Sequence, residues 1–127
     1  MGYFIIEEQL PSMNEYIATM NNNRHNGNRF KGEIEEMIGW YIKQALTAGT
    51  LRPFGETPCE ISIEWHEATK RRDVDNIQSA QKFIMDALQA QKVIKRDSQR
   101  YVRQIYHKII SGKENYVVVR MLPYECN

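Results

Sequence analysis

The chain has few cysteines and no long apolar segment. Its two cysteines, Cys59 and Cys126, lie far apart and match no metal-binding or redox spacing. We therefore expect both thiols to be reduced, one in a strand and one at a frayed chain end, as is typical of a cytosolic protein. No apolar run approaches the roughly 20 residues that span a bilayer, and no basic stretch followed by a long apolar one opens the chain. The sequence thus predicts neither export nor membrane insertion.

Internal repeats are also absent, and the one biased stretch is the Asn-rich segment at residues 20–28. We expect this segment to be a polar loop that is mobile or ordered only by a ligand. With 127 residues, of which 42% are hydrophobic, the chain is long enough for one domain with a real core and too short for two. We therefore expect residues 1–127 to form a single domain.

Charge is unevenly distributed, although the net charge of the whole chain is only +1. Residues 70–103 contain nine Lys or Arg and four Asp, a net charge of +5, so the rest of the chain carries the difference from +1, which is −4. Such a charged run often forms only a solvated face. A basic segment in an otherwise acidic chain also suits a phosphate-rich partner, which makes nucleic acid a candidate.

Short apolar and β-branched runs predict four strands, and two longer stretches have helical periodicity. We expect strands at residues 3–8, 59–67, 101–110 and 115–122, with the last two joined as a hairpin through residues 111–114. Helices are expected at residues 30–46 and 76–91. This β-α-β-α-β-β order predicts an α+β fold in which a mixed sheet packs against two helices. Trp40 and Trp65 lie on apolar sides of these elements and are expected in the core.

The stretch KRRDVDNIQ, at residues 70–78, places three cations directly before two aspartates, Asp73 and Asp75. A cap on the following helix would account for Asp75, since a carboxylate there accepts free amide hydrogens. An ordinary i,i+4 ion pair would account for Lys82 with Asp86. Neither explanation covers Asp73.

A further aspartate, Asp97, again follows a Lys and an Arg. Carboxylates held close together repel one another unless they are protonated or share a cation. Mg²⁺ binds a few protein carboxylates and keeps its other positions for water and substrate phosphate. Asp73, Asp75 and Asp97 are therefore a candidate metal site, and the neighbouring cations would hold phosphates.

Several of these elements, in this order, resemble the RusA family of Holliday junction resolvases. They are the basic pair and D-x-D-N of RRDVDNI, the helix segment KFIMDAL, and the final Asp of VIKRDS. LPSMNEY, at residues 10–16, is similar to the Leu-Pro, Asn and Tyr element near the N-terminus of family members. The expected order of strands and helices agrees with the family fold, so the resemblance covers most of the chain.

The resemblance implies a small homodimeric endonuclease that resolves four-way DNA junctions with Mg²⁺ or Mn²⁺ and no organic cofactor. Family members are often encoded by phages or prophages, which implies a bacterial cytoplasmic protein. Asp73, Asp75 and Asp97 would be the metal-binding catalytic carboxylates. Lys82 would be the catalytic lysine, although some members have a shorter spacing, so this match requires a three-residue gap. The DNA contacts would come from the remaining polar and basic residues, Lys70, Arg71, Arg72, Asn76, Lys92, Lys95, Arg96, Arg100 and Arg103.

Two other functions fit the same residues. The protein could bind branched DNA without cutting it, with Asp73 and Asp75 serving only as a cap and an ion-pair acceptor. It could also be a nuclease that acts on flaps or replication forks. The three histidines share no ligand spacing, so we expect them to be surface or strand residues: His25, His66 and His107. Tyr16, Arg24 and the Asn-rich segment are further candidates for junction contacts.

Overall fold

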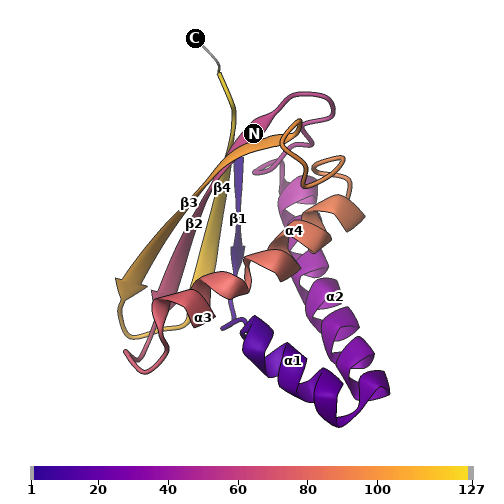
Figure 1. Ribbon diagram of the computed structural model, residues 1–127. Helices are drawn as coiled ribbons and strands as arrows, with labels where there is room; N and C mark the ends of the chain where they lie inside the picture. The colour runs from indigo at the N-terminus through magenta and orange to yellow at the C-terminus, as the bar shows by residue number, and fades with distance from the viewer. Residues whose placement is uncertain (1, 126–127) are drawn as a thin grey trace.

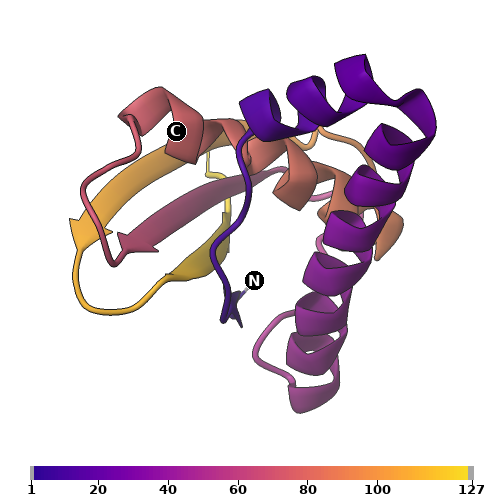
Figure 2. The same ribbon diagram turned by 90° about the horizontal axis from the view of Figure 1, so that it is seen from below.

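The computed structural model describes residues 2–125, in which one mixed sheet carries helices on a single face (Figures 1 and 2). The elements in chain order are β1 (Gly2–Ile6), α1 (Met13–Asn22), α2 (Arg24–Ala48), β2 (Cys59–Glu67), α3 (Val74–Ser79), α4 (Gln81–Ala90), β3 (Val102–Ser111) and β4 (Tyr116–Pro123). The expected α+β fold with a mixed sheet is confirmed. Four helices take the place of the two that the periodicity predicted.

The strands lie in the order β1-β4-β2-β3. β2 is parallel to β3 and antiparallel to β4, and β4 is antiparallel to β1. The predicted hairpin between the last two strands is therefore wrong, because β2 lies between them. Their connector crosses the end of β2, where the Gly112 amide donates to the Glu67 carbonyl and the Asn115 side chain accepts from the Ala68 amide at 2.8 Å. A turn sequence specifies a reversal of the chain but not which strand becomes the neighbour.

The core lies between the sheet and α2 and α4. Alternate residues of β2 face the helices and are at most 1% exposed, as the alternation predicted: Cys59, Ile61, Ile63 and Trp65. They pack in one cluster with Ile38 and Ile42 of α2 and with Phe83 and Leu88 of α4. Cys59 is a free thiol, and burial raises its pKa to about 11; Cys126 lies outside the described residues. The expectation for Trp40 is wrong, because this residue is 57% exposed and lines an open cavity beside β1.

The Asn-rich segment is helical rather than a loop, which corrects the sequence-based expectation. α1 begins where the Ser12 hydroxyl accepts from the Glu15 amide at 3.2 Å, and α2 begins where the Asn23 side chain accepts from the Asn26 amide at 3.2 Å. These two caps satisfy amides that a helix start leaves free. α2 has 25 residues. Even so, no helix within residues 2–125 combines the length and apolar character needed to cross a membrane.

The helix predicted at residues 76–91 is divided into α3 and α4 at Ala80. The Ser79 hydroxyl donates to the Asn76 carbonyl at 2.7 Å, and the Ala80 amide bonds to the Ile77 carbonyl at 3.3 Å. A carbonyl engaged by a serine side chain and a local three-residue turn both interrupt the regular ladder. α3 also begins earlier than expected, with Asp73 rather than Asp75 as its N-cap residue, and without a side-chain capping bond. The prediction that Asp75 caps this helix is therefore wrong.

Candidate active site

Asp73 and Asp75 lie at the start of α3, just after the loop that follows β2. The backbone carbonyl of Asp73 accepts from the Ile77 amide at 3.1 Å, which fixes this first turn. Both side chains are exposed. Within residues 2–125, neither carboxylate has an ion pair or a side-chain hydrogen bond. Two unneutralised carboxylates one residue apart are available to an external cation.

Lys82, on α4, lies between two other aspartates. Its Nζ is 3.1 Å from Oδ1 of Asp86 and 3.9 Å from Oδ2 of Asp97, which belongs to the loop between α4 and β3. The predicted pair with Asp86 is thus confirmed. The hydrogen bond that Lys82 donates to Asp86 raises the pKa of Lys82, and the negative charge of Asp97 acts in the same direction. Lys31 of α2 approaches the other Asp86 oxygen at 3.6 Å.

A cavity of about 280 Å³ opens beside the break between α3 and α4. Its lining combines the Lys82 and Asp97 side chains with polar and apolar neighbours, namely Gln78, Ser79, Gln81, Met85 and Ile105. Asp75 lies about one helical turn before Gln78 on α3. The structure therefore groups Lys82 and Asp97 in one concave surface and places the D-x-D pair next to it in the chain.

His107 supports this cavity from beneath, a role that its sequence position did not reveal. The Trp65 indole N–H donates to His107 Nδ1 at 2.9 Å, so the ring proton lies on Nε2, which is 2.9 Å from Oε1 of Gln81. Burial lowers the pKa of His107, which favours this neutral form. The signal was its register: His107 pairs with Ile63, a buried residue, so its side chain points toward the helices.

The residues present fit a divalent metal ion only in part. Among the residues that the structure describes, no three His, Cys, Asp or Glu side chains converge on one point, so Asp73, Asp75 and Asp97 do not form a closed three-ligand site. Mg²⁺, however, commonly binds one or two carboxylates and completes its shell with water and substrate phosphate. The exposed pair of Asp73 and Asp75 has the donor chemistry for such an open site.

Arg72 joins three segments around the D-x-D pair. Its guanidinium donates to both oxygens of Glu67, at 3.0 and 3.3 Å, and to the carbonyl of Leu10 at 2.8 Å. Glu67 is only 4% exposed. A two-pronged pair with a nearly buried carboxylate is geometrically specific. Arg72 directly precedes Asp73. It therefore ties the end of β2 and the segment before α1 to the start of α3.

α1 is hydrogen-bonded to the same region. The Asn14 side chain donates to Oδ1 of Asn76 at 2.6 Å, and the Met13 amide donates to the Ser79 hydroxyl at 3.0 Å. The LPSMNEY element and the D-x-D-N element, far apart in sequence, are thus in direct contact. Asn76 is engaged by protein rather than free in this arrangement.

The other predicted DNA contacts divide into free and paired cations. Lys70, Arg71 and Arg96 are exposed and have no carboxylate partner within residues 2–125. Lys95 and Arg100 instead share Glu56, which Arg100 approaches at 3.4 Å. The hydrogen bond from Lys95 lowers the pKa of Glu56. These cations border a second cavity, of about 470 Å³, which is lined by Lys95, Arg96, Ser98, Arg100 and Tyr101.

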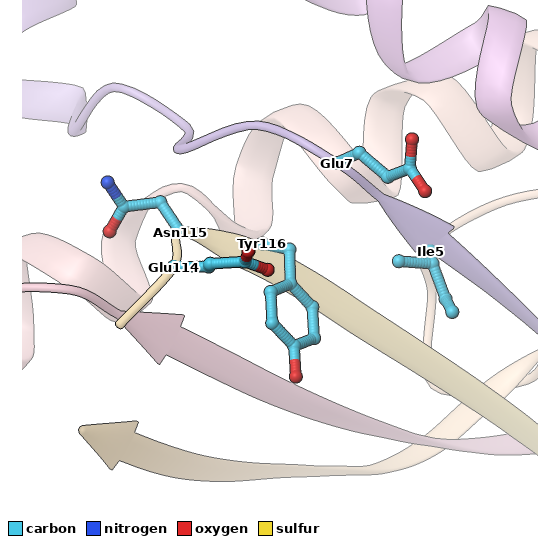
Figure 3. A pocket seen from close by; sticks show the side chains of 5 residues that line it. All are labelled: Ile5, Glu7, Glu114, Asn115 and Tyr116. Carbon is cyan, nitrogen blue, oxygen red and sulfur yellow. The ribbon is translucent and has the colours of Figure 1, made fainter. Parts of the chain in front are cut away.

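A further cavity, of about 440 Å³, opens on the sheet face that carries no helix. Figure 3 shows its lining, with Ile5 and Glu7 on the β1 side and Glu114, Asn115 and Tyr116 on the approach to β4. It contains two carboxylates and no Lys or Arg. An anionic DNA backbone would be repelled there, so the cavity beside Lys82 is the better candidate.

Comparison with protein families agrees with the motifs. Residues 2–121 match the model of the family described as Endodeoxyribonuclease RusA. The matched range includes all the candidate site residues. No curated protein gave a match.

Proposed function

This chain belongs to the RusA endodeoxyribonuclease family, and we propose that it resolves four-way DNA junctions by metal-dependent hydrolysis, with paired, symmetric cuts. Family membership implies an endodeoxyribonuclease that acts on Holliday junctions. The observation that carries the finer proposal is the pair of exposed, unpartnered carboxylates, Asp73 and Asp75, next to the cavity that contains Lys82. Cations are close to both parts of this site in sequence, at residues 70–72 before Asp73 and at residues 95–100 around Asp97.

In this proposal Asp73 and Asp75 hold Mg²⁺ or Mn²⁺, and Asp97 is the third acidic residue of the site. The chemistry that such an ion supplies is a bound water of lowered pKa and compensation of phosphate charge. The contribution of the chain is to keep two carboxylates exposed and close together. The Arg72 clamp with Glu67 and Leu10 supports their loop.

Lys82 supplies positive charge at the cavity. Because its pKa is raised by Asp86 and Asp97, the ammonium remains protonated at neutral pH and cannot act as a general base. It can donate hydrogen bonds to phosphoryl oxygens and stabilise charge that develops on the departing 3′-oxygen. Asp86, held in turn by Lys31, positions the ammonium.

The exposed cations around the cavity would bind the DNA backbone. Lys70, Arg71 and Arg96 are free to pair with phosphates. Lys95 and Arg100 would exchange Glu56 for phosphate as the DNA arrives. Such contacts provide affinity and fix the register without reading bases.

A homodimer follows from the substrate. A four-way junction has approximate two-fold symmetry, so two copies related by a two-fold axis would present equivalent sites to opposed strands. The family resemblance supports this assembly, and it supports a phage- or prophage-encoded protein of the bacterial cytoplasm.

One observation favours a second function, binding of branched DNA without cleavage. Within residues 2–125 the three predicted ligands do not converge on a point. In a non-cleaving protein Asp73 and Asp75 would have no metal to hold. Two carboxylates without a partner would then weaken binding to phosphates, which is why we favour the nuclease.

The deciding experiment is cleavage of an end-labelled synthetic four-way junction with Mg²⁺ or Mn²⁺, beside a flap, a fork and a linear duplex of the same sequence. Paired symmetric nicks in the junction, absent with Asp75→Asn although that variant still binds, would support the proposal. Tight junction binding without cleavage in either metal would support the binding protein. Faster cleavage of the flap or fork would identify a different branched substrate.

A further inference from the structure

A second basic stretch, this one without any carboxylate, lies outside the segment that the D-x-D motif occupies. Residues 16–32 contain three Lys or Arg, five Asn and no Asp or Glu. With +3 in this stretch and +5 in residues 70–103, the rest of the chain carries the difference from +1, which is −7. Positive charge is therefore concentrated in two segments of the chain.

α1 connects these two segments in space. It begins against the D-x-D-N element, through the Asn14–Asn76 and Met13–Ser79 hydrogen bonds, and Tyr16 packs edge-on against Phe83 of α4 at 6.1 Å between ring centroids. From there α1 runs outward and ends where α2 begins, and Figures 1 and 2 show this turn at the edge of the molecule. Ten residues of helix span roughly 15 Å.

The turn itself, residues 21–29, is called the α1–α2 corner below. Every residue of the corner except Gly27 is exposed. Asn23 caps α2 and Arg29 pairs with Glu33 at 3.1 Å, whereas Arg24 and the side chain of Asn22 have no partner within residues 2–125.

The corner has a fixed shape. Gly27 is buried against Met20, and a Cβ there would lie 2.9 Å from the Met20 Cα, so only glycine permits this approach of α1 to α2. A surface that is already ordered loses less conformational entropy when it binds a ligand.

We infer that the α1–α2 corner binds a junction arm, with Arg24 on a phosphate and the Asn side chains on phosphates or base edges. This rests on the proposed function. The corner lies roughly 15 Å along α1 from the D-x-D-N element, a distance of about four base pairs at 3.4 Å per step. Arg pairs with phosphate through two parallel hydrogen bonds, and Asn amides both donate and accept, as base edges require.

The test compares Arg24→Gln with Lys43→Gln, which removes one exposed charge roughly 28 Å farther along the same helix. Junction binding is measured by fluorescence anisotropy in EDTA over a series of salt concentrations. Arg24→Gln should weaken binding about ten-fold and reduce the slope of log K against log salt by about 0.9, the value for one phosphate contact. Lys43→Gln should match the wild type in both.

Hydroxyl-radical footprints give an independent readout. The wild type should protect the backbone about four base pairs from the cut, and Arg24→Gln should lose that protection while protection at the cut remains. Equal binding and equal footprints for both variants, with unchanged melting temperatures, would overturn the inference. A wild type that neither binds nor cuts junctions would instead overturn the proposed function, so the two failures are distinct.

Discussion

Two pairs of aspartates near α3 and α4 differ in what neutralises them. Asp86 and Asp97 share the Lys82 ammonium, whereas Asp73 and Asp75 have no ion pair within residues 2–125. Both pairs lie among cations, so a lack of nearby Lys or Arg does not explain the difference. Carboxylates left exposed and unpaired beside cations add nothing to stability, which is consistent with a role toward a bound ion.

The largest expected effect on cleavage comes from substituting one of the two aspartates that have no ion pair, Asp73 and Asp75. Asp75→Asn should reduce junction cleavage more than about 100-fold, because the proposed metal site would lose one ligand. The free energy of unfolding should change by less than about 0.5 kcal/mol, since the side chain is exposed and has no partner. Single-turnover cleavage and urea unfolding measure the two quantities. A variant that cuts normally would show that this carboxylate has no catalytic role.

The next largest effect on cleavage is expected from Lys82, the lysine that Asp86 and Asp97 share. Lys82→Gln should slow cleavage on the order of 100-fold, because charge on the phosphoryl group loses a donor, while junction affinity changes only slightly. Asp86→Asn should slow cleavage less, about ten-fold, because Lys82 remains but is held only by Asp97. Rates measured at saturating DNA separate catalysis from binding. Equal rates for Lys82→Gln and the wild type would remove Lys82 from the mechanism.

A third group of charges sharpens the comparison. Here one carboxylate, Glu56, neutralises two cations that DNA would otherwise use, Lys95 and Arg100. Glu56→Gln should free Lys95 and Arg100 and strengthen junction binding about three- to five-fold, with a steeper salt dependence. Glu64→Gln, which frees one exposed Arg120 on the sheet face that carries no helix, is a matched control. Anisotropy titrations at two salt concentrations measure both effects. Weaker binding by Glu56→Gln would mean that Glu56 orders these cations for the DNA.

The smallest expected effect is on the pH dependence of stability, and it comes from His107, the neutral histidine beneath the cavity. Because burial lowers the pKa of His107, the unfolded chain takes up a proton at this residue before the folded protein does as the pH falls. Its contribution to stability is therefore full above a pH of about 6.5 and is lost at lower pH. The wild type should lose more of its free energy of unfolding between pH 7.5 and 5.5 than His107→Gln does.

At pH 7.5 His107→Gln should be less stable by about 1 kcal/mol, because the Trp65 indole loses its acceptor. Urea unfolding at the two pH values gives both numbers, and His25→Gln, an exposed histidine, is the control. Parallel pH profiles for the wild type and His107→Gln would contradict the lowered pKa.

Local patterns predicted strands better than their pairing. The alternation at Cys59–Glu67 identified β2 and its buried face, because a half-buried strand must alternate. The hairpin was wrong because the parallel pairing of β2 with β3 depends on contacts between distant segments. The sequence did not predict α1, because Asn has a low helix propensity. Helix caps at Ser12 and Asn23, which are recognisable in the sequence, compensate for this low propensity.

The candidate site was predictable where it is contiguous in sequence. Asp73 and Asp75 follow from one motif, and the pairing of Lys82 with Asp86 follows from one helical turn. The proximity of Asp97 to Lys82 and the clamp of Arg72 on Glu67 and Leu10 depend on how loops fold back onto the helices. His107 and Gln81 meet across β3 and α4, so only the register of the sheet reveals them.

The strand order has a consequence for how the chain is made. Within residues 2–125, β4 is the one strand that pairs with β1, Gly2 opposite Met121 and Ile6 opposite Val117. Apart from a single bridge between Gly2 and Leu51, β1 therefore has no β partner until β4 is synthesised. At about 5–20 residues per second, that interval is roughly 6–20 seconds. During it Phe4 and Ile6, both buried in the finished protein, remain outside the sheet. The sheet is thus expected to close only once β4 has been synthesised, and truncation before residue 117 would leave an exposed apolar edge open to aggregation.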